Sequence, residues 1–253
     1  MSRAPKFVLR DVERRWGSRV AVRGIALTIE PGERLALVGP SGSGKTTLLR
    51  LLTATLRTSA GVVEVDGRAI AAMTPGEIRA HRRRCGLVDQ GKAMIPGLSV
   101  HANVLAGRAA TWPWWRTLAS AVWPLDRDDV RALLGDVGLD DRQWDRVDEL
   151  SGGQQQRVAI ARALAGEQSV LLADEPTAAL DPATAAEVIA LLLRETRRRE
   201  ATLIVSTHRV SQVLGEVDRV IGLRAGELAF DMPAADVDDA ALAAIYEGSR
   251  ERG

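Results

Sequence analysis

The feature that most restricts how this chain folds is a glycine-rich loop, Gly39-Pro-Ser-Gly-Ser-Gly-Lys45-Thr46. An apolar strand pattern, Arg34–Val38, comes directly before it, and a helical pattern with leucines on one face, Thr46–Arg57, follows. Glycines let the backbone bend so that several N–H groups converge on one anion, and the start of the helix adds the positive end of its dipole. The loop matches G-x-x-x-x-G-K-[ST], and its strand–loop–helix context predicts a phosphate-binding loop rather than a chance run of glycine and serine.

Two side chains at the end of this loop have tasks at a nucleotide phosphate. Lys45 brings a full positive charge to the outer phosphates, and the Thr46 hydroxyl is placed to ligate Mg²⁺. The nucleotide-binding residues predicted here are Gly39, Pro40, Ser41, Gly42, Ser43, Gly44, Lys45, Thr46 and Thr47.

Short apolar segments alternate with longer helical patterns along most of the chain, which predicts an α/β fold with a mostly parallel sheet covered on both faces. The beginning differs, since Lys6–Asp11 and Val20–Glu30 are strand patterns that favour a small antiparallel layer. Between about Gly91 and Leu150 helical patterns dominate, so we expect an inserted helical subdomain. The other expected elements are strands at Val62–Val65, Gly86–Asp89, Val170–Asp174 and Thr202–Ser206, helices after Ser151 and over Ala183–Arg199, and a closing hairpin of Val220–Leu223 and Glu227–Phe230.

A pair of carboxylates, Asp174-Glu175, ends the apolar strand pattern that begins at Val170. Because successive side chains of a strand point in different directions, one carboxylate can hold a metal while the other faces an attacking water. This suits Asp174 as the Mg²⁺ residue and Glu175 as the general base. An apolar run that ends in two acids is common by itself, so the prediction depends on its combination with the phosphate loop.

The segment Leu150-Ser-Gly-Gly-Gln-Gln-Gln-Arg157 offers a second phosphate-binding surface, because Ser151 is a good N-cap and the two glycines expose backbone N–H groups at a helix start. At this segment the chain resembles the ATP-binding subunits of ABC transporters, whose LSGGQ signature it contains intact. The resemblance extends from Phe7 to Phe230 and implies a P-loop NTPase core of RecA-like form. It also implies that two copies sandwich two ATP molecules head to tail. The signature residues Ser151, Gly152, Gly153 and Gln154 would then contact the γ-phosphate of ATP held by the other copy.

Further roles follow from the same resemblance. Gln90 resembles the glutamine that touches Mg²⁺ and water, Asp181 lies in the loop that crosses the dimer interface, and His208 resembles the switch histidine at the γ-phosphate. Trp16 takes the place of the aromatic residue that stacks on adenine. The resemblance thus implies Glu175, His208 and Gln90 as catalytic residues and Thr46, Gln90 and Asp174 as Mg²⁺ ligands.

Two of these assignments have a structural alternative, and one neighbouring residue departs from the family pattern. A histidine after a strand is usually a surface or capping residue, and only its order after Asp174-Glu175 and Asp181 favours His208. Trp16 would otherwise anchor the N-terminal hairpin as a hydrophobic residue. Asp89 departs from the family, which commonly has an aromatic or aliphatic residue before the glutamine, and an extra carboxylate there would alter metal affinity or coupling.

We expect one nucleotide-binding domain of the ABC type over residues 1–253. Its RecA-like core would comprise about 1–91 and 158–232, its helical subdomain about 92–157, and its C-terminal extension about 233–253.

Several segments look like the phosphonate-importer branch of the family. They are Asn103–Arg108, Trp115-Arg116, Asp218–Gly226, Phe230-Asp231 and Ile245-Tyr246. The phosphate, amino-acid and lipoprotein-release branches share most of the same motifs and remain alternatives. Four of the six tryptophans fall in 111–116 and 121–123, where they either pack within the helical subdomain or dock a membrane subunit.

Composition restricts the compartment and the partners. With 34 basic and 33 acidic residues the net charge is +1, which argues against binding nucleic acid through bulk charge.

No apolar run has the ~18–20 residues of a membrane span, and the N-terminus lacks the apolar stretch of a signal peptide. The single cysteine, Cys85, excludes an internal disulfide and fits a reducing compartment. The basic clusters Arg79–Arg84 and Arg194–Arg199 are interpreted as solvated helix faces.

The resulting expectation is a soluble chain that binds and hydrolyses ATP with Mg²⁺ at the cytoplasmic face of the membrane. It would pair with a second copy and with integral permease subunits, and indirectly with a solute-binding protein. The competing classes are a soluble ABC ATPase that remodels ribosomes or DNA and a nucleotide-gated regulator without turnover. A single cassette with a short insertion disfavours the first, and intact Glu175 and His208 disfavour the second.

Overall fold

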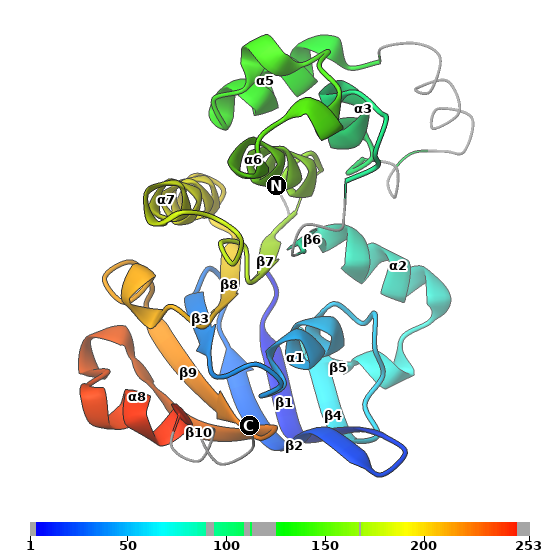
Figure 1. Cartoon of the computed structure of the whole chain (residues 1–253). Helices are drawn as coiled ribbons and strands as arrows, with labels where there is room; N and C mark the ends of the chain where they lie inside the picture. Colours follow the sequence, from blue (N-terminus) through cyan, green and yellow to red (C-terminus); the bar gives the residue numbers. More distant parts are fainter. Residues whose placement is uncertain (1–3, 90–93, 109–111, 113–124, 167, 247–253) are drawn as a thin grey trace.

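The computed structural model describes residues 4–89, 94–108, 112, 125–166 and 168–246 (Figure 1). Its strands are β1 Phe7–Trp16, β2 Arg19–Ile29, β3 Arg34–Val38, β4 Ala60–Val65, β5 Arg68–Ala69, β6 Cys85–Val88, β7 Val170–Asp174, β8 Thr202–Thr207, β9 Arg219–Arg224 and β10 Glu227–Pro233. Its helices are α1 Lys45–Leu52, α2 Pro75–Arg84, α3 Val100–Leu105, α5 Arg127–Asp136, α6 Gly152–Ala163, α7 Pro182–Arg198 and α8 Asp239–Tyr246, with short 3₁₀ turns at Ile70–Ala72, Asp140–Arg142, Val147–Glu149, Val210–Gln212 and Ala234–Asp236.

Two sheets organise the described residues. The larger sheet has the strand order β10-β9-β3-β8-β7-β6, in which β10 runs antiparallel to β9 and the other neighbours are parallel. The smaller sheet is antiparallel, with the order β2-β1-β4-β5. Every residue of β7 and β8 is buried, which explains why their central residues form a continuous apolar run, with polar residues only at the strand ends, instead of alternating. The predicted α/β fold with a P-loop NTPase core and a small antiparallel layer is confirmed.

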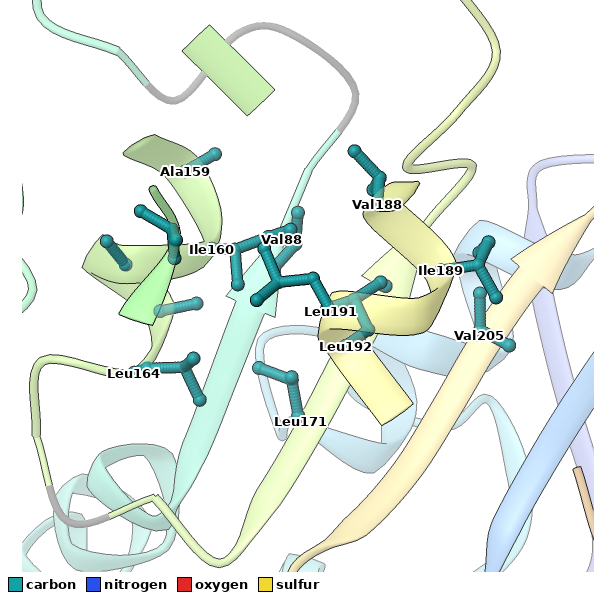
Figure 2. Packing of buried hydrophobic residues seen from close by; sticks show 14 of the residues in the cluster. Val88, Ala159, Ile160, Leu164, Leu171, Val188, Ile189, Leu191, Leu192 and Val205 are labelled. Atoms are coloured by element: carbon teal, nitrogen blue, oxygen red, sulfur yellow. The ribbon is translucent and has the colours of Figure 1, made fainter. Parts of the chain in front are cut away.

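Two apolar clusters hold these layers together. One joins the two sheets around α1 and includes Phe7, Ile29 and Leu48. The other lies between the larger sheet and helices α6 and α7. Figure 2 shows Leu191 and Leu192 of α7 beside Ile160 of α6 and the strand residues. Burying one such leucine or isoleucine contributes about 1.5–3 kcal/mol relative to leaving it in water. This cluster therefore fixes α6 and α7 on the sheet that contains β7, the strand that ends at the acidic pair.

The described part of the segment between β6 and β7 contains helices α3, α5 and α6 joined by turns, and these helices lie together at one end of the molecule (Figure 1). Helix α6 is continuous over Gly152–Ala163, so the expected limit of the helical subdomain at residue 157 falls inside a helix. Helix α8 packs on β9 and β10, with Ile245 fully buried. Within the described ranges, every helix is too short or too polar to span a bilayer.

The helix predicted over Thr46–Arg57 is wrong at its C-terminal end, because α1 stops at Leu52. Ala54 adopts a left-handed φ of 54°, and the N–H groups of Thr55 and Leu56 both donate to the carbonyl of Arg50. This turn closes the helix one turn early and directs the chain toward β4.

Candidate nucleotide-binding and hydrolysis site

The loop between β3 and α1 is held in a shape that only glycine permits at two positions. Gly39 has φ 153°, and a Cβ there would lie 2.2 Å from the carbonyl oxygen of Leu223. Gly44 has φ 108°, and its Cβ would lie 2.7 Å from the carbonyl oxygen of Ala21. The loop is therefore wedged between β2 and the β9–β10 hairpin, so its backbone is preorganised.

Lys45, the first residue of α1, is buried beneath this loop. Its Nζ donates to the carbonyl oxygens of Gly39 at 2.8 Å and Pro40 at 3.1 Å. It also lies 3.3 Å from Oε1 of Glu175. The ammonium group thus links the loop to the acidic pair at the end of β7.

A pocket of about 620 Å³ opens at this place. Its lining residues are Trp16, Arg19, Val20, Ala21, Ser41, Gly42, Gly44, Lys45, Thr46, Thr47, Asp174 and Glu175. Trp16 is 46% exposed, and the guanidinium of Arg14 lies 4.8 Å from the centroid of its indole. An accessible aromatic surface therefore borders the same pocket as the phosphate loop.

The acidic pair is positioned by the neighbouring strand β8. Oδ1 of Asp174 accepts a hydrogen bond from the Ser206 hydroxyl at 2.7 Å. The backbone N–H of Glu175 donates to the Ser206 hydroxyl at 2.9 Å and to the Ser206 carbonyl oxygen at 3.2 Å. Glu175 has a left-handed φ of 47°, which is unusual for a residue with a side chain. This backbone turn separates the directions of the two carboxylates.

His208 lies beside the pocket, although it is not part of its lining. Its Nδ1 is 3.5 Å from Oε2 of Glu175. The backbone carbonyl of His208 accepts a hydrogen bond from the Tyr246 hydroxyl at 3.1 Å, so α8 holds the loop that carries the histidine. The Glu175 carboxylate therefore lies between Lys45 and His208.

The donor set of this pocket fits Mg²⁺ bound together with a nucleotide. Thr46 and Asp174 both line it, and Asp174 is 7% exposed. Among the described residues there is no group of three or more histidine, cysteine or acidic side chains that forms a metal site alone. One carboxylate and one hydroxyl, completed by phosphate oxygens and water, is the arrangement that Mg²⁺ commonly takes at nucleotides.

The signature segment lines a different pocket, of about 410 Å³. Ser151 caps α6 by accepting from the N–H of Gln154, whose side chain bonds back to the N–H of Ser151. Gly153 packs so closely on α7 that a Cβ there would lie 2.6 Å from Cγ2 of Thr184. The residues around the pocket are Gly138, Leu139, Ser151, Gly152, Gly153, Gln154, Arg157, Ala179, Leu180, Asp181 and Thr184.

Asp181 lines this second pocket as the N-cap of α7. Its side chain accepts from the N–H groups of Ala183 and Thr184, both at 3.1 Å. Hydrogen bonding from Thr184 and from this helix start holds the pKa of Asp181 below its ordinary value, so it stays ionised at neutral pH.

The predicted site residues thus form two groups. The two pockets have no lining residue in common. Gly39, Pro40 and Ser43 do not line the first pocket, and Gly39 and Pro40 act instead through backbone contacts with Lys45. Gln90 lies outside the described residues. Of the tryptophan-rich segment only Trp112 is described, and it packs half-buried against the larger apolar cluster.

Ser206 is the main residue that the sequence patterns did not single out. It pairs with Asp174 in the parallel register of β7 and β8. A polar residue near the carboxyl end of an apolar strand is its only sequence signal, and the identity of the neighbouring strand is needed to interpret that signal. Arg19 and Thr184 also line the pockets without a motif of their own.

Comparison with curated proteins finds close relatives. The chain is 48% identical over 246 residues to the phosphonates import ATP-binding protein PhnC of Anaeromyxobacter dehalogenans, covering 97% of this chain and 49% of that protein. It is also 48% identical over 226 residues to PhnC 2 of Pseudomonas aeruginosa, covering 89% of this chain and 85% of that protein. The chain therefore spans about half the length of the first relative and most of the second.

Solved structures agree with this relationship. The dimeric structure of MJ0796, described as a bacterial ABC transporter cassette, aligns with a TM-score of 0.78 at 29% identity and covers 90% of this chain and 98% of that one. Its post-hydrolysis dimer bound to ADP and Pi gives a TM-score of 0.75 at 29% identity, with the same coverage. The ABC transporter family model matches residues 22–178. The chain belongs to the ABC transporter family, as one of its ATP-binding cassettes.

Proposed function

We propose that this chain is the ATP-hydrolysing subunit of an importer for phosphonates or a related phosphorus oxyanion. The observation that carries the substrate class is the run of relatives named phosphonates import ATP-binding proteins, at 40–48% identity over at least 89% of this chain. The cassette itself never contacts the solute, so its contribution is the coupled hydrolysis of ATP.

In this proposal the first pocket binds ATP. Adenine stacks on Trp16, and the phosphates lie on the N–H groups of the loop and on Lys45. Because Lys45 is only 5% exposed, its attraction to a phosphate is screened less than it would be in water. Thr46 and Asp174 would hold Mg²⁺, which would supply positive charge at the phosphates when bound. Gln90 is assigned to the same metal and water on the family resemblance.

Glu175 is the proposed general base. It accepts a proton from a water whose oxygen forms a bond to the γ-phosphorus, while the bond from that phosphorus to the β–γ bridging oxygen breaks and ADP leaves. His208 is assigned to the γ-phosphate, and the 3.5 Å distance from its Nδ1 to Oε2 of Glu175 supports a shared task of the two side chains. The products are ADP and inorganic phosphate.

Two copies complete each site. The signature pocket contributes Ser151 and the N–H groups at the start of α6, which favour an anion. Because the two pockets of one copy share no lining residue, we assign the second half of each ATP cage to the partner copy. ATP then stabilises a closed dimer, and its hydrolysis allows the dimer to reopen.

Membrane attachment is assigned to partners. We place the chain at the cytoplasmic face of the membrane, where the helical regions of two copies bind integral permease subunits and a separate solute-binding protein delivers the substrate. Closure of the cassette dimer moves the permease.

Replacing Trp16 by alanine is expected to lower ATP affinity about 5- to 150-fold, because stacking of a base on an aromatic ring contributes about 1–3 kcal/mol. Trp16→Tyr retains a ring and should stay near the wild type. Calorimetry with ATP measures the effect, and tripolyphosphate, which has no base, is the control ligand. Equal losses for ATP and tripolyphosphate would contradict a stacking role.

Deletion of the gene in its source organism tests the substrate class. We expect growth with a phosphonate as sole phosphorus source to be lost and growth on phosphate to be kept. Wild-type chain should restore growth, and Glu175→Gln should not. Normal growth on phosphonate, or defects confined to phosphate, amino-acid uptake or lipoprotein release, would contradict the proposal.

Copurification is a second test, of transport itself. Copurification of the chain with ribosomes or DNA instead of a detergent-solubilised permease would contradict the transport function altogether.

A further inference from the structure

A single buried hydroxyl lies between the two acidic residues of the site. Ser206 is 0% exposed, and its Oγ donates to Asp174 at 2.7 Å while accepting the N–H of Glu175 at 2.9 Å. A serine hydroxyl has one donor hydrogen and two acceptor lone pairs, so both bonds form simultaneously. This one group therefore contacts the residue assigned to Mg²⁺ and the residue assigned to the attacking water.

The bond to Asp174 restricts how that carboxylate is oriented. With Oδ1 bound to Ser206, rotation of the carboxylate about its last torsion breaks a hydrogen bond inside a buried site, where an unsatisfied group is costly. A neutral donor also leaves the negative charge of Asp174 in place, whereas an arginine or lysine would compensate it. Ser206 thus orients the carboxylate without competing with a cation.

The bond to Glu175 holds an unfavourable backbone conformation. The left-handed conformation is unfavourable for a residue with a side chain, and Glu175 has φ 47°. Its N–H is shared between the hydroxyl and the carbonyl oxygen of Ser206. That turn directs the Glu175 side chain between Lys45 and His208, at 3.3 and 3.5 Å.

We propose that Ser206 is a positioning residue that orients the Asp174 carboxylate for Mg²⁺ and holds the backbone turn that aims Glu175. The proposal rests on the function proposed above, in which Asp174 holds the metal and Glu175 is the base. Ser206 acts through these two residues and takes no proton itself.

The test compares Ser206→Ala with Thr202→Val. Thr202 is equally buried on β8, and its hydroxyl accepts the N–H of Gly32 at the opposite end of the strand, so its replacement removes a buried hydrogen bond away from the site. ATP binding is measured by calorimetry in Mg²⁺ and in EDTA, and hydrolysis is followed while Mg²⁺ is titrated. If the alanine variant folds poorly, Ser206→Cys replaces it in the test, because cysteine is similar in size to serine but is only a weak hydrogen-bond donor.

In Ser206→Ala we expect the Mg²⁺-dependent gain in ATP affinity to fall about 10- to 100-fold, while affinity in EDTA stays unchanged. The Mg²⁺ concentration for half-maximal hydrolysis should rise by a similar factor, and Ser206→Thr, which retains the hydroxyl, should recover part of both. Thr202→Val should match the wild type in these Mg²⁺ measurements.

If the wild type binds and hydrolyses Mg-ATP, two results would overturn the role of Ser206 and leave the proposed function standing. One is unchanged Mg²⁺ dependence in Ser206→Ala, and the other is an equal loss of affinity in Mg²⁺ and in EDTA, which a merely structural residue would cause. A wild-type chain whose ATP binding ignores Mg²⁺ overturns the proposed function and the inference together.

Discussion

Glu175→Gln is expected to lower ATP turnover by about 10²- to 10⁴-fold, the usual contribution of a general base, and to keep ATP binding. Glutamine has nearly the same size as glutamate but does not take up the proton of the attacking water. The bonds that hold the backbone of residue 175 come from its N–H to Ser206, so they survive the substitution. Since bound ATP is not consumed, the variant should accumulate as a closed dimer.

Gel filtration with Mg-ATP, together with a phosphate-release assay, measures both effects. Glu216→Gln is the matched control, because Glu216 is an exposed carboxylate paired with Arg197 away from the pocket. Glu216→Gln should hydrolyse ATP at the wild-type rate and should not accumulate as a closed dimer. If Glu175→Gln elutes only as a monomer and hydrolyses ATP at the normal rate, the assignment of Glu175 is wrong.

Lys45→Ala is expected to lower ATP affinity by about 10- to 150-fold, because a hydrogen bond to a charged group contributes about 1.5–3 kcal/mol. The substitution also removes the contacts that tie the carbonyls of Gly39 and Pro40 together under the loop. Because fewer sites are then occupied by ATP at ordinary ATP concentrations, the rate of ATP hydrolysis should fall as well. The variant is therefore expected to remain without an ATP-dependent dimer.

Calorimetry with ATP measures this loss, and Lys6→Ala is the control, because Lys6 forms an exposed ion pair with Glu30. Thermal unfolding of both variants separates a folding defect from a binding defect. Unchanged ATP affinity in folded Lys45→Ala would remove this lysine from its proposed role.

Much of the core was predictable because its strands are buried on both faces. Strands β3 and β7 begin and end at the residues expected from their continuous apolar runs. The predicted closing hairpin forms, and its turn at Ala225-Gly226 has left-handed φ values of 50° and 87°. Burial and turn chemistry are local properties, and local patterns predict them well.

Which strands lie next to each other in the sheet was harder to predict from the sequence. That β8 lies next to β7, and so brings Ser206 against Asp174, depends on the strand order of the sheet and on its register. The early end of α1 depends on a left-handed residue, Ala54, that is not glycine, so no turn residue indicated it. The continuity of α6 across the expected subdomain limit reflects its packing on α3, α5 and α7. These features arise from tertiary contacts rather than from local propensity.

The central claim is that each ATP is bound from both sides by two copies of the chain. A structure of Glu175→Gln with Mg-ATP tests it most directly. We predict that the backbone N–H groups near Gly153 of one copy lie within hydrogen-bonding distance of the terminal phosphate held by Lys45 of the other. A terminal phosphate enclosed by one copy alone, with Gly153 of every other copy remote from it, would contradict the account.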